Sequence, residues 1–158
     1  MSLLAFFQWC YATNVGETIR NSTFLFPVIE AVHLLGFGLT ASAVLLVEMR
    51  LLGAGVKDQP VAELAKSAQP WLFGGIVLMF ASGIPLFMSE SMKAYYSFAF
   101  WVKMTCLFLA LVYTFTLRRR ITGGDFMYDR PRLARTMAII SLGLWFGVAW
   151  GGRWIGFS

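Results

Sequence analysis

Four long apolar segments constrain this chain more than any other feature of its sequence. A helix needs about 20 mostly apolar residues to cross the hydrocarbon core of a bilayer. The segments that meet this need span residues 24–49, 71–88, 98–117 and 136–157. Of the 158 residues, 58% are hydrophobic and only 13% are charged, whereas a soluble domain has roughly 45–50% and about 25%. Water cannot solvate a surface so poor in charge, so the sequence predicts an integral membrane protein whose solvent is the lipid bilayer.

The length suits one domain, and we predict a single membrane domain over residues 1–158. The predicted fold class is all-α, an integral membrane four-helix bundle with an N-terminal amphipathic interfacial helix. Residues 1–23 mix Phe6 and Trp9 with polar side chains, which is typical of a helix lying on the membrane surface. Asn21 or Ser22 is expected to cap the start of the first span.

The connections between the spans are polar. The stretch "GVKDQPVAELAKSAQP" predicts a turn and a short surface helix before the second span. The stretch "RRRITGGDFMYDRPRLAR" predicts a polar loop between the third and fourth spans. Because proline interrupts helical hydrogen bonding, Pro85 is expected to bend or end the last turn of the second span.

The distribution of lysine and arginine predicts the orientation. Four spans place both termini on one side of the membrane. The loops at residues 50–70 and 118–135 hold nine of the thirteen basic residues, and the terminal side holds four. Since cytoplasmic loops carry the excess of basic residues, we expect both loops to be cytoplasmic and both termini periplasmic, in a bacterial inner membrane. The same bias accounts for the net charge of +5, so nucleic acid is not an expected partner.

Four ionisable residues are expected at one level in the membrane. Glu30 and His33 lie about six and nine residues into the first span, which is roughly 9 and 14 Å. Lys103 lies about five residues into the third span, and Arg153 lies about four residues from the end of the fourth. Charged groups inside a membrane usually face a protein interior and pair with each other. The alternatives are that Lys103 and Arg153 extend to the headgroups, that Glu30 pairs with one of them only to hold helices together, and that His33 is a hydrogen-bonded packing residue.

Glu48 and Arg50 lie at the other end of the first span. Counting residues places both at the cytoplasmic rim. We therefore expect them to form an exposed pair or to anchor the following loop.

Glu30 and His33 form an E-x-x-H pair, the spacing that di-iron bundles use on two of their helices. A di-iron site needs a second such pair, and a tetrahedral zinc or copper site needs more His or Cys ligands than this chain offers. Haem needs only one good axial ligand, for which His33 is the candidate metal ligand. Glu30 is expected to orient the site, and Lys103 and Arg153 to neutralise the propionates. The second axial ligand is absent, or is Met88, Met104 or a histidine of another copy.

Small residues recur at helical spacing near this level. Gly143, Gly147 and Gly151 follow one another at every fourth position, and Gly36 lies just beyond His33. Small residues on one face permit close contact between membrane helices, within the chain or in a homo-oligomer. The functional alternative is clearance for a flat cofactor, which makes Gly36 and Gly147 candidate cofactor-binding residues.

Three stretches carry a resemblance to a known family. They are "IRNSTFLFPVIEAVHLLGFGLTASAVLLVEMRLLG", "FWVKMTCLFLALVYTFTLRRR" and "SLGLWFGVAWGGRWIGF". Together they resemble an uncharacterised bacterial family of small four-span membrane proteins, catalogued only as a domain of unknown function. The resemblance implies the four-helix architecture over nearly the whole chain and implies no activity. Paired histidines like those of di-haem cytochrome b bundles are missing, so only an oligomer could offer two histidines to one cofactor.

The residues therefore favour a membrane haem b protein with a redox or electron-transfer role near the periplasmic face, and a redox protein is then a candidate partner. Copper, or no cofactor, is the alternative. Two other functions stay open: a non-catalytic scaffold or oligomeric subunit with a buried ion-pair network, and a small proton-coupled transporter or quinone-site protein. Whether the chain is an enzyme is not decided by the sequence, in which a nucleophile–histidine–carboxylate set is not evident.

Overall fold

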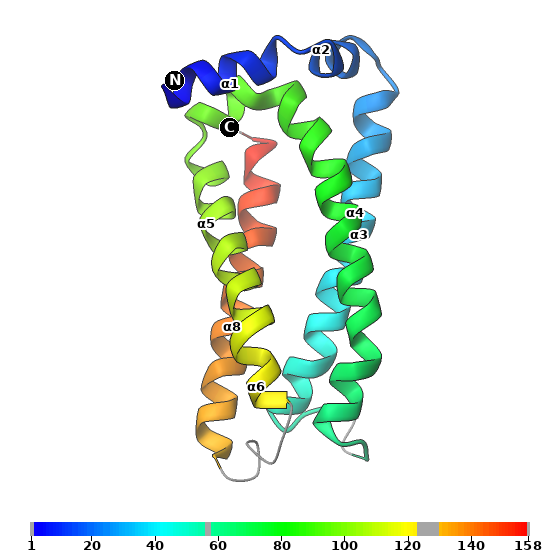
Figure 1. Cartoon of the computed structure of the whole chain (residues 1–158), viewed down its shortest axis with the longest axis vertical. Helices are drawn as coiled ribbons and strands as arrows, with labels where there is room; N and C mark the ends of the chain where they lie inside the picture. The colour runs from blue at the N-terminus through cyan, green and yellow to red at the C-terminus, as the bar shows by residue number, and fades with distance from the viewer. Residues whose placement is uncertain (1, 56–57, 123–129, 158) are drawn as a thin grey trace.

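The computed structural model describes residues 2–55, 58–122 and 130–157, and this part of the chain is all-helical, as predicted. In Figure 1 the long helices run side by side along one axis, two short helices lie across one end, and both termini lie at that end. We refer to this end as the terminal end and to the opposite one as the loop end. The helices are α1 (Leu3–Tyr11), α2 (Asn14–Asn21), α3 (Leu25–Leu51), α4 (Val61–Tyr96), α5 (Phe98–Tyr113), the π-helix η1 (Thr114–Arg118), α6 (Arg119–Thr122) and α8 (Pro131–Ile155).

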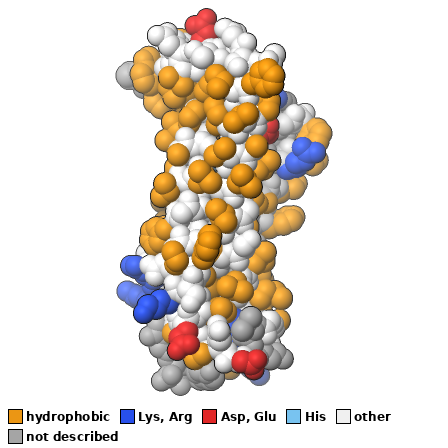
Figure 2. All heavy atoms as spheres, turned by 90° about the vertical axis from the view of Figure 1, so that its right-hand side faces the viewer, with side chains coloured by type: hydrophobic (Ala, Val, Ile, Leu, Met, Phe, Trp, Pro, Cys, Tyr) orange, Lys and Arg blue, Asp and Glu red, His pale blue; other side chains and the backbone are white. Residues whose placement is uncertain are grey.

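Four helical segments are long and apolar enough to cross a membrane, which supports a multi-pass membrane protein. They are Leu25–Leu51, Val61–Tyr96, Phe98–Thr122 and Pro131–Ile155. Only 22–28% of their most apolar stretches is buried inside the protein, and Figure 2 shows apolar side chains covering the middle of one face. An apolar outer surface of this extent is typical of a protein that contacts lipid.

Helix α4 differs from the sequence prediction in its length and in the position of its bend. The short surface helix and the second span lie in one helical element of 36 residues, α4, which includes Pro70 and Pro85 and has a kink near its terminal end. Membrane helices tolerate proline because neighbouring groups satisfy the freed backbone carbonyls. The departure from helical geometry lies instead at Glu90, with φ −121° and ψ 23°.

The N-terminal segment forms two helices where one was expected. Thr13 separates α1 from α2, and its hydroxyl oxygen accepts a hydrogen bond from the backbone N–H of Gly16 at 3.2 Å. The N-cap position of α3 is Phe24, which makes no side-chain capping bond, so the cap expected at Asn21 or Ser22 does not occupy that position. Ser22 nevertheless contacts the start of the helix. Its hydroxyl accepts hydrogen bonds from the N–H groups of Phe24 and Leu25 at 3.4 and 3.2 Å, so it satisfies donors that the helix leaves free.

Helices α1 and α2 pack on the terminal ends of α4 and α5. The Phe7 ring lies 5.2–6.2 Å from the rings of Phe87, Tyr95, Phe100 and Trp101. Polar contacts add to this packing: Ser91 donates to the carbonyl of Phe7 at 2.9 Å, and Arg20 donates to the carbonyl of Ser89 at 3.0 Å. These contacts fix the N-terminal segment on the long helices.

The long helices associate as two pairs, α3 with α4 and α5 with α8. Glycine makes both contacts close. A Cβ atom at Gly36 would lie 3.0 Å from the backbone nitrogen of Met79, and one at Gly75 would lie 2.8 Å from the carbonyl oxygen of Gly36. In the other pair, a Cβ at Gly151 would lie 2.9 Å from the carbonyl oxygen of Ala99. Backbones can approach this closely only where side chains are missing.

The two pairs meet mainly through α3 and α8. A shared apolar core lies toward the loop end, where side chains from α3, α4, α5, α6 and α8 come together. Its buried members are Ala43, Val44, Val47, Leu51, Val61, Ala68, Leu72, Ala110, Ile121, Ala134, Ala138, Trp145 and Val148.

The glycine contact between α3 and α4 predicts unequal effects of two nearby alanine substitutions. Gly36→Ala is expected to destabilise the protein by about 1–3 kcal/mol, because the added methyl group meets the α4 backbone. Gly38→Ala is the matched control, since a Cβ there meets no atom within 4 Å. Thermal unfolding of both variants in one detergent measures the difference. Equal midpoints for the two variants would refute the packing role of Gly36.

A second prediction concerns Cys10, which is buried on the inner face of α1. Burial raises the pKa of the Cys10 thiol above its ordinary value. Because the thiolate is the reacting species, alkylation of the folded protein is expected to be slow near neutral pH and to accelerate with rising pH beyond the range of an ordinary thiol. Mass spectrometry after timed alkylation measures this, with Cys106→Ala as the background and detergent-denatured protein as control. Equal rates for folded and denatured protein would contradict it.

Candidate functional site

His33 lies on α3 and is held by α4. Its Nδ1 atom lies 3.0 Å from the carbonyl oxygen of Met79 and 3.1 Å from the hydroxyl oxygen of Ser82. The ring is half-buried, and its Cε1 atom lies 3.0 Å from the position of a Cβ at Gly83, so a larger residue there would press on the imidazole. The position of the ring thus depends on the contact between the two helices.

The hydrogen bonds of His33 define its tautomer. A backbone carbonyl only accepts, so Nδ1 donates to Met79. The Ser82 hydroxyl donates to the carbonyl of Leu78 at 2.6 Å, so its oxygen is free to accept from the same Nδ1. In a neutral imidazole the proton therefore belongs to Nδ1, and the lone pair belongs to Nε2.

Lys103, on α5, faces His33 from the other helix pair. The two side chains lie within electrostatic range of each other. The stem of Lys103 lies against α8, where a Cβ at Gly151 would be 2.9 Å from its Cβ and a Cβ at Gly152 would be 3.6 Å from its Nζ. Among the predicted cofactor-binding residues, His33 and Lys103 thus lie within electrostatic range of each other, without a direct contact between them being established.

Glu30 and Arg153 lie apart from this pair. Both side chains are exposed, and the Arg153 guanidinium lies 4.7 Å from the ring centre of Phe157. Glu30 is the sixth residue of α3, close enough to its end for the carboxylate to reach the membrane surface. The E-x-x-H spacing therefore does not bring Glu30 and His33 into one buried site.

Neighbouring protein atoms already occupy the space beside Gly36 and Gly147. Gly36 lies against the α4 backbone, and a Cβ at Gly147 would lie 2.6 Å from the Sγ atom of Cys106. Both glycines thus provide helix contact, which is the first of the two predicted roles. Of the candidate second ligands, Met104 is exposed and Met88 is half-buried.

A second group of polar residues, which the sequence interpretation placed wrongly, lies toward the loop end. Glu48 was expected to be exposed at the membrane rim, but its side chain is fully buried, and Arg50 is only 9% exposed. Arg50 nevertheless anchors the loop as expected, because its Nε atom donates to the carbonyl of Gln59 at 3.1 Å. The expectation failed because α3 continues to Leu51, so its last turn packs against the other helices.

Other buried polar side chains accompany Glu48. Arg118 and Tyr113 lie within electrostatic range of its carboxylate, and the Ser141 hydroxyl lies beside it. Arg118 also donates from Nη2 to the carbonyl of Ala43 at 3.3 Å. These residues were missed because the run Arg118–Arg120 was interpreted as a topological signal, although only Arg119 and Arg120 are exposed. Ser141, a polar residue at the centre of an apolar span, was the available signal.

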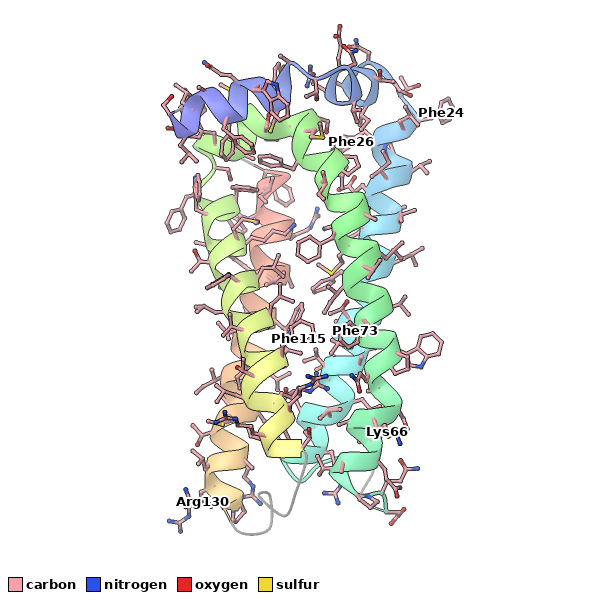
Figure 3. The ribbon with its side chains drawn as sticks, viewed as in Figure 1. Phe24, Phe26, Lys66, Phe73, Phe115 and Arg130 are labelled. Atoms are coloured by element: carbon pink, nitrogen blue, oxygen red, sulfur yellow. The ribbon has the colours of Figure 1, made fainter. Side chains whose placement is uncertain are left out.

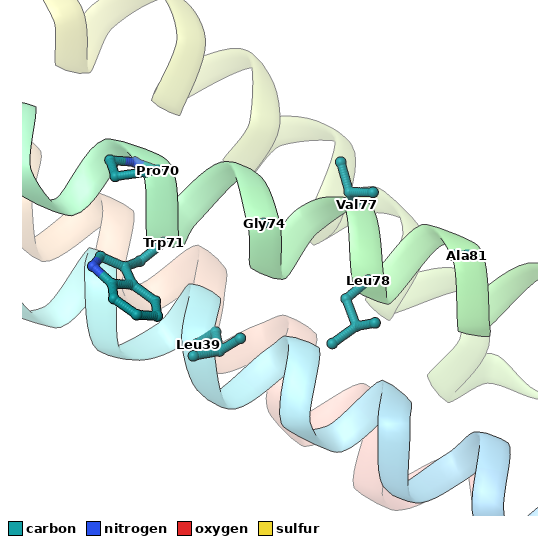
Figure 4. Close-up of a pocket in the computed structure, with 7 residues that line it drawn as sticks. All are labelled: Leu39, Pro70, Trp71, Gly74, Val77, Leu78 and Ala81. Carbon is teal, nitrogen blue, oxygen red and sulfur yellow. The ribbon is translucent and has the colours of Figure 1, made fainter.

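Two cavities lie away from His33. One of about 530 Å³ is an apolar groove along α3 and α4, shown in Figure 4; it is lined by Leu39, Pro70, Trp71, Gly74, Val77, Leu78 and Ala81. Its surface suits an acyl chain. The other, of about 190 Å³, lies between α4 and the η1–α6 segment. There Phe73 and Phe115 approach each other to 5.4 Å between ring centres (Figure 3).

Comparison with known proteins identifies a family. The sequence model of DUF6644, described as a family of unknown function, matches residues 6–158. Searches of curated proteins and of solved structures found no match. The family match covers His33 and Lys103 as well as the group around Glu48. The chain therefore belongs to DUF6644, a family of unknown function.

Proposed function

We propose that this chain is a b-type haem-binding protein of the bacterial inner membrane, with a redox or electron-transfer role near the periplasmic face. The observation that carries the proposal is the hydrogen bond from His33 Nδ1 to the carbonyl of Met79. Histidines that bind metals usually donate their other ring N–H to a carbonyl or carboxylate, which fixes the tautomer and orients the ring. His33 has this arrangement, and Nε2 is then the coordinating atom.

The positive charge of Lys103 favours haem over a free metal ion as the ligand of this site. Haem carries anionic propionates, and a lysine across from the axial histidine offers a charge-assisted hydrogen bond to one of them. A positive charge beside His33 would, in contrast, oppose the binding of a free metal cation. Haem supplies one-electron chemistry when bound, and this role requires a redox partner protein. Glu30 and Arg153 are exposed, so we assign neither of them to the interior of the site.

The second axial ligand is proposed to come from another copy of the chain. Met104 is exposed, and the sequence has one histidine. A homo-oligomer can present two copies of His33 to one haem, and the exposed Gly143 offers a surface for close contact between copies, because a Cβ there meets no atom within 4 Å.

The membrane arrangement is part of the proposal. We propose that the four spans form a four-helix bundle, with α1 and α2 as an amphipathic segment at the periplasmic interface. Nine basic residues in the loops against four toward the termini support a cytoplasmic loop end.

Haem binding predicts a spectrum that depends on His33. Protein purified gently from its membrane is expected to show a Soret band that shifts on reduction with dithionite, and His33→Ala is expected to lose it, because no other histidine can replace the axial ligand. The haem-to-protein ratio tests the proposed oligomer. Two copies of His33 on one haem predict one haem per two chains.

Glu30→Gln is the matched control, since it removes an exposed negative charge one turn away on the same helix and should keep the band. A histidine that only joins α3 to α4 would give no Soret band in the wild type. Metal analysis of the same sample separates this outcome from bound copper.

The orientation predicts where a reporter enzyme is active. Alkaline phosphatase fused after residue 158 is expected to be active, because it folds only outside the cytoplasm. Fusion after Thr122, at the end of the third span, is expected to leave it inactive. The opposite pattern would reverse the proposed topology.

A further inference from the structure

Seven buried polar atoms near the loop end have no hydrogen-bond partner among the described residues. They are Glu48 Oε1 and Oε2, Tyr113 Oη, Thr114 Oγ1, Arg118 Nη1, Ser141 Oγ and Trp145 Nε1. The six side chains come from α3, α5, η1 and α8, and each is at most 5% exposed. Buried polar groups in proteins are nearly always hydrogen-bonded, so a group of this size indicates that something else satisfies them.

Among these groups, the Glu48 carboxylate is the most costly to bury without hydrogen bonds. An ionised carboxylate in an apolar interior is strongly disfavoured unless it accepts hydrogen bonds or is neutralised. Neither of its oxygens has a well-placed hydrogen-bond donor within the described part of the chain, although the Ser141 hydroxyl lies near enough to interact with the carboxylate. Two remedies exist that require no movement of the helices: a proton on the carboxylate, and water molecules that bridge it to the neighbouring hydroxyls.

The neighbours of Glu48 favour a proton over a metal ion. The charged or titratable groups that face it are Arg118 from η1 and Tyr113 from α5. From α8 comes the Ser141 hydroxyl, which stays neutral. The guanidinium repels any added positive charge, so a sodium or calcium ion beside it is disfavoured. A proton meets the same repulsion, but it forms a covalent O–H bond that removes the buried charge of the carboxylate and adds a hydrogen-bond donor.

A cavity leads from this group toward the loop end. Thr114 and Arg118 belong to both the buried group and the lining of the 190 Å³ cavity. The exposed side chains of Lys66, Gln69 and Arg119 line the same cavity, and Lys66 lies near the loop end of α4 in Figure 3. Thr114 and Arg118 are the first and last residues of η1, and π-helical turns inside α-helices often occur at functional sites.

We propose that Glu48 is a hydrated proton-binding site, bridged by water to Tyr113, Ser141 and Arg118, which exchanges protons with the loop side through this cavity. Binding is a reversible transfer of one proton from water to a carboxylate oxygen, and no other bond changes. The site lies at the opposite end of α3 from His33 and does not rest on haem binding.

Infrared spectroscopy of the full-length protein in lipid tests the proposal. Difference spectra over the pH range in which the protein stays folded are expected to contain a carboxylic-acid band that appears and disappears reversibly and is lost in Glu48→Gln. Glu30→Gln, which removes an exposed carboxylate from the same helix, is the control and should keep this band. If wild type and Glu48→Gln titrate identically, Glu48 stays ionised as a structural partner of Arg118, and the proposal is overturned.

Two further measurements keep the test independent of the folding of Glu48→Gln. Ser141→Ala retains the carboxylate and should shift its band, because the neighbouring hydroxyl is removed; an unshifted band overturns the proposed hydrogen-bonded water network. Transfer into D₂O should shift the wild-type band rapidly, and Ala65→Phe, which fills the cavity, should slow this exchange severalfold. Unchanged exchange in Ala65→Phe overturns access from the loop end.

Discussion

The absence of water from the hydrocarbon core is the constraint on which the rest of this structure depends. In lipid every backbone N–H and C=O must be satisfied within the protein, and helices meet that requirement within one segment. The same constraint explains why large apolar side chains cover the outside of all four spans. It also gives the few polar side chains inside their significance, because each must find a partner in the protein or a ligand. His33 is hydrogen-bonded to α4, whereas the carboxylate oxygens of Glu48 lie near Ser141 and Arg118 without a well-placed hydrogen bond among the described residues.

Helix packing and site geometry are linked at the contact between α3 and α4. Gly36 allows the α3 backbone to reach the α4 backbone at Met79, whose carbonyl accepts the hydrogen bond from His33. The close contact that joins the helices therefore also sets the tautomer and orientation of the imidazole. A substitution at Gly36 acts on stability and on the site together, so a lost spectrum in such a variant would not by itself identify a ligand.

The sequence was sufficient for the spans and insufficient for the sites, for a physical reason. Hydropathy and length locate a membrane helix because lipid acts on every residue of it. Counting residues along a helix measures depth and not the direction of a side chain. Glu30 and His33 are three residues apart, yet one is exposed and the other contacts α4. Burial of Glu48 and Arg118 depends on where α3, η1 and α6 end and on the π-helical turn, and neither feature has a recognisable sequence signal here.

The two polar groups lie at different depths, and this separation limits what they can do together. His33 and Glu48 are fifteen residues apart on α3, a distance of about 22 Å along the helix axis. The interval contains Thr40, Val44 and Val47, which are packed in the protein interior with at most 1% of their surface exposed. Thr40 donates its hydroxyl to the carbonyl of Gly36, so it is already satisfied within its own helix. Chemistry at one group therefore has no direct polar route along α3 to the other. The apolar core that separates the two groups lies at the level of Val44 and Val47, where the two helix pairs meet.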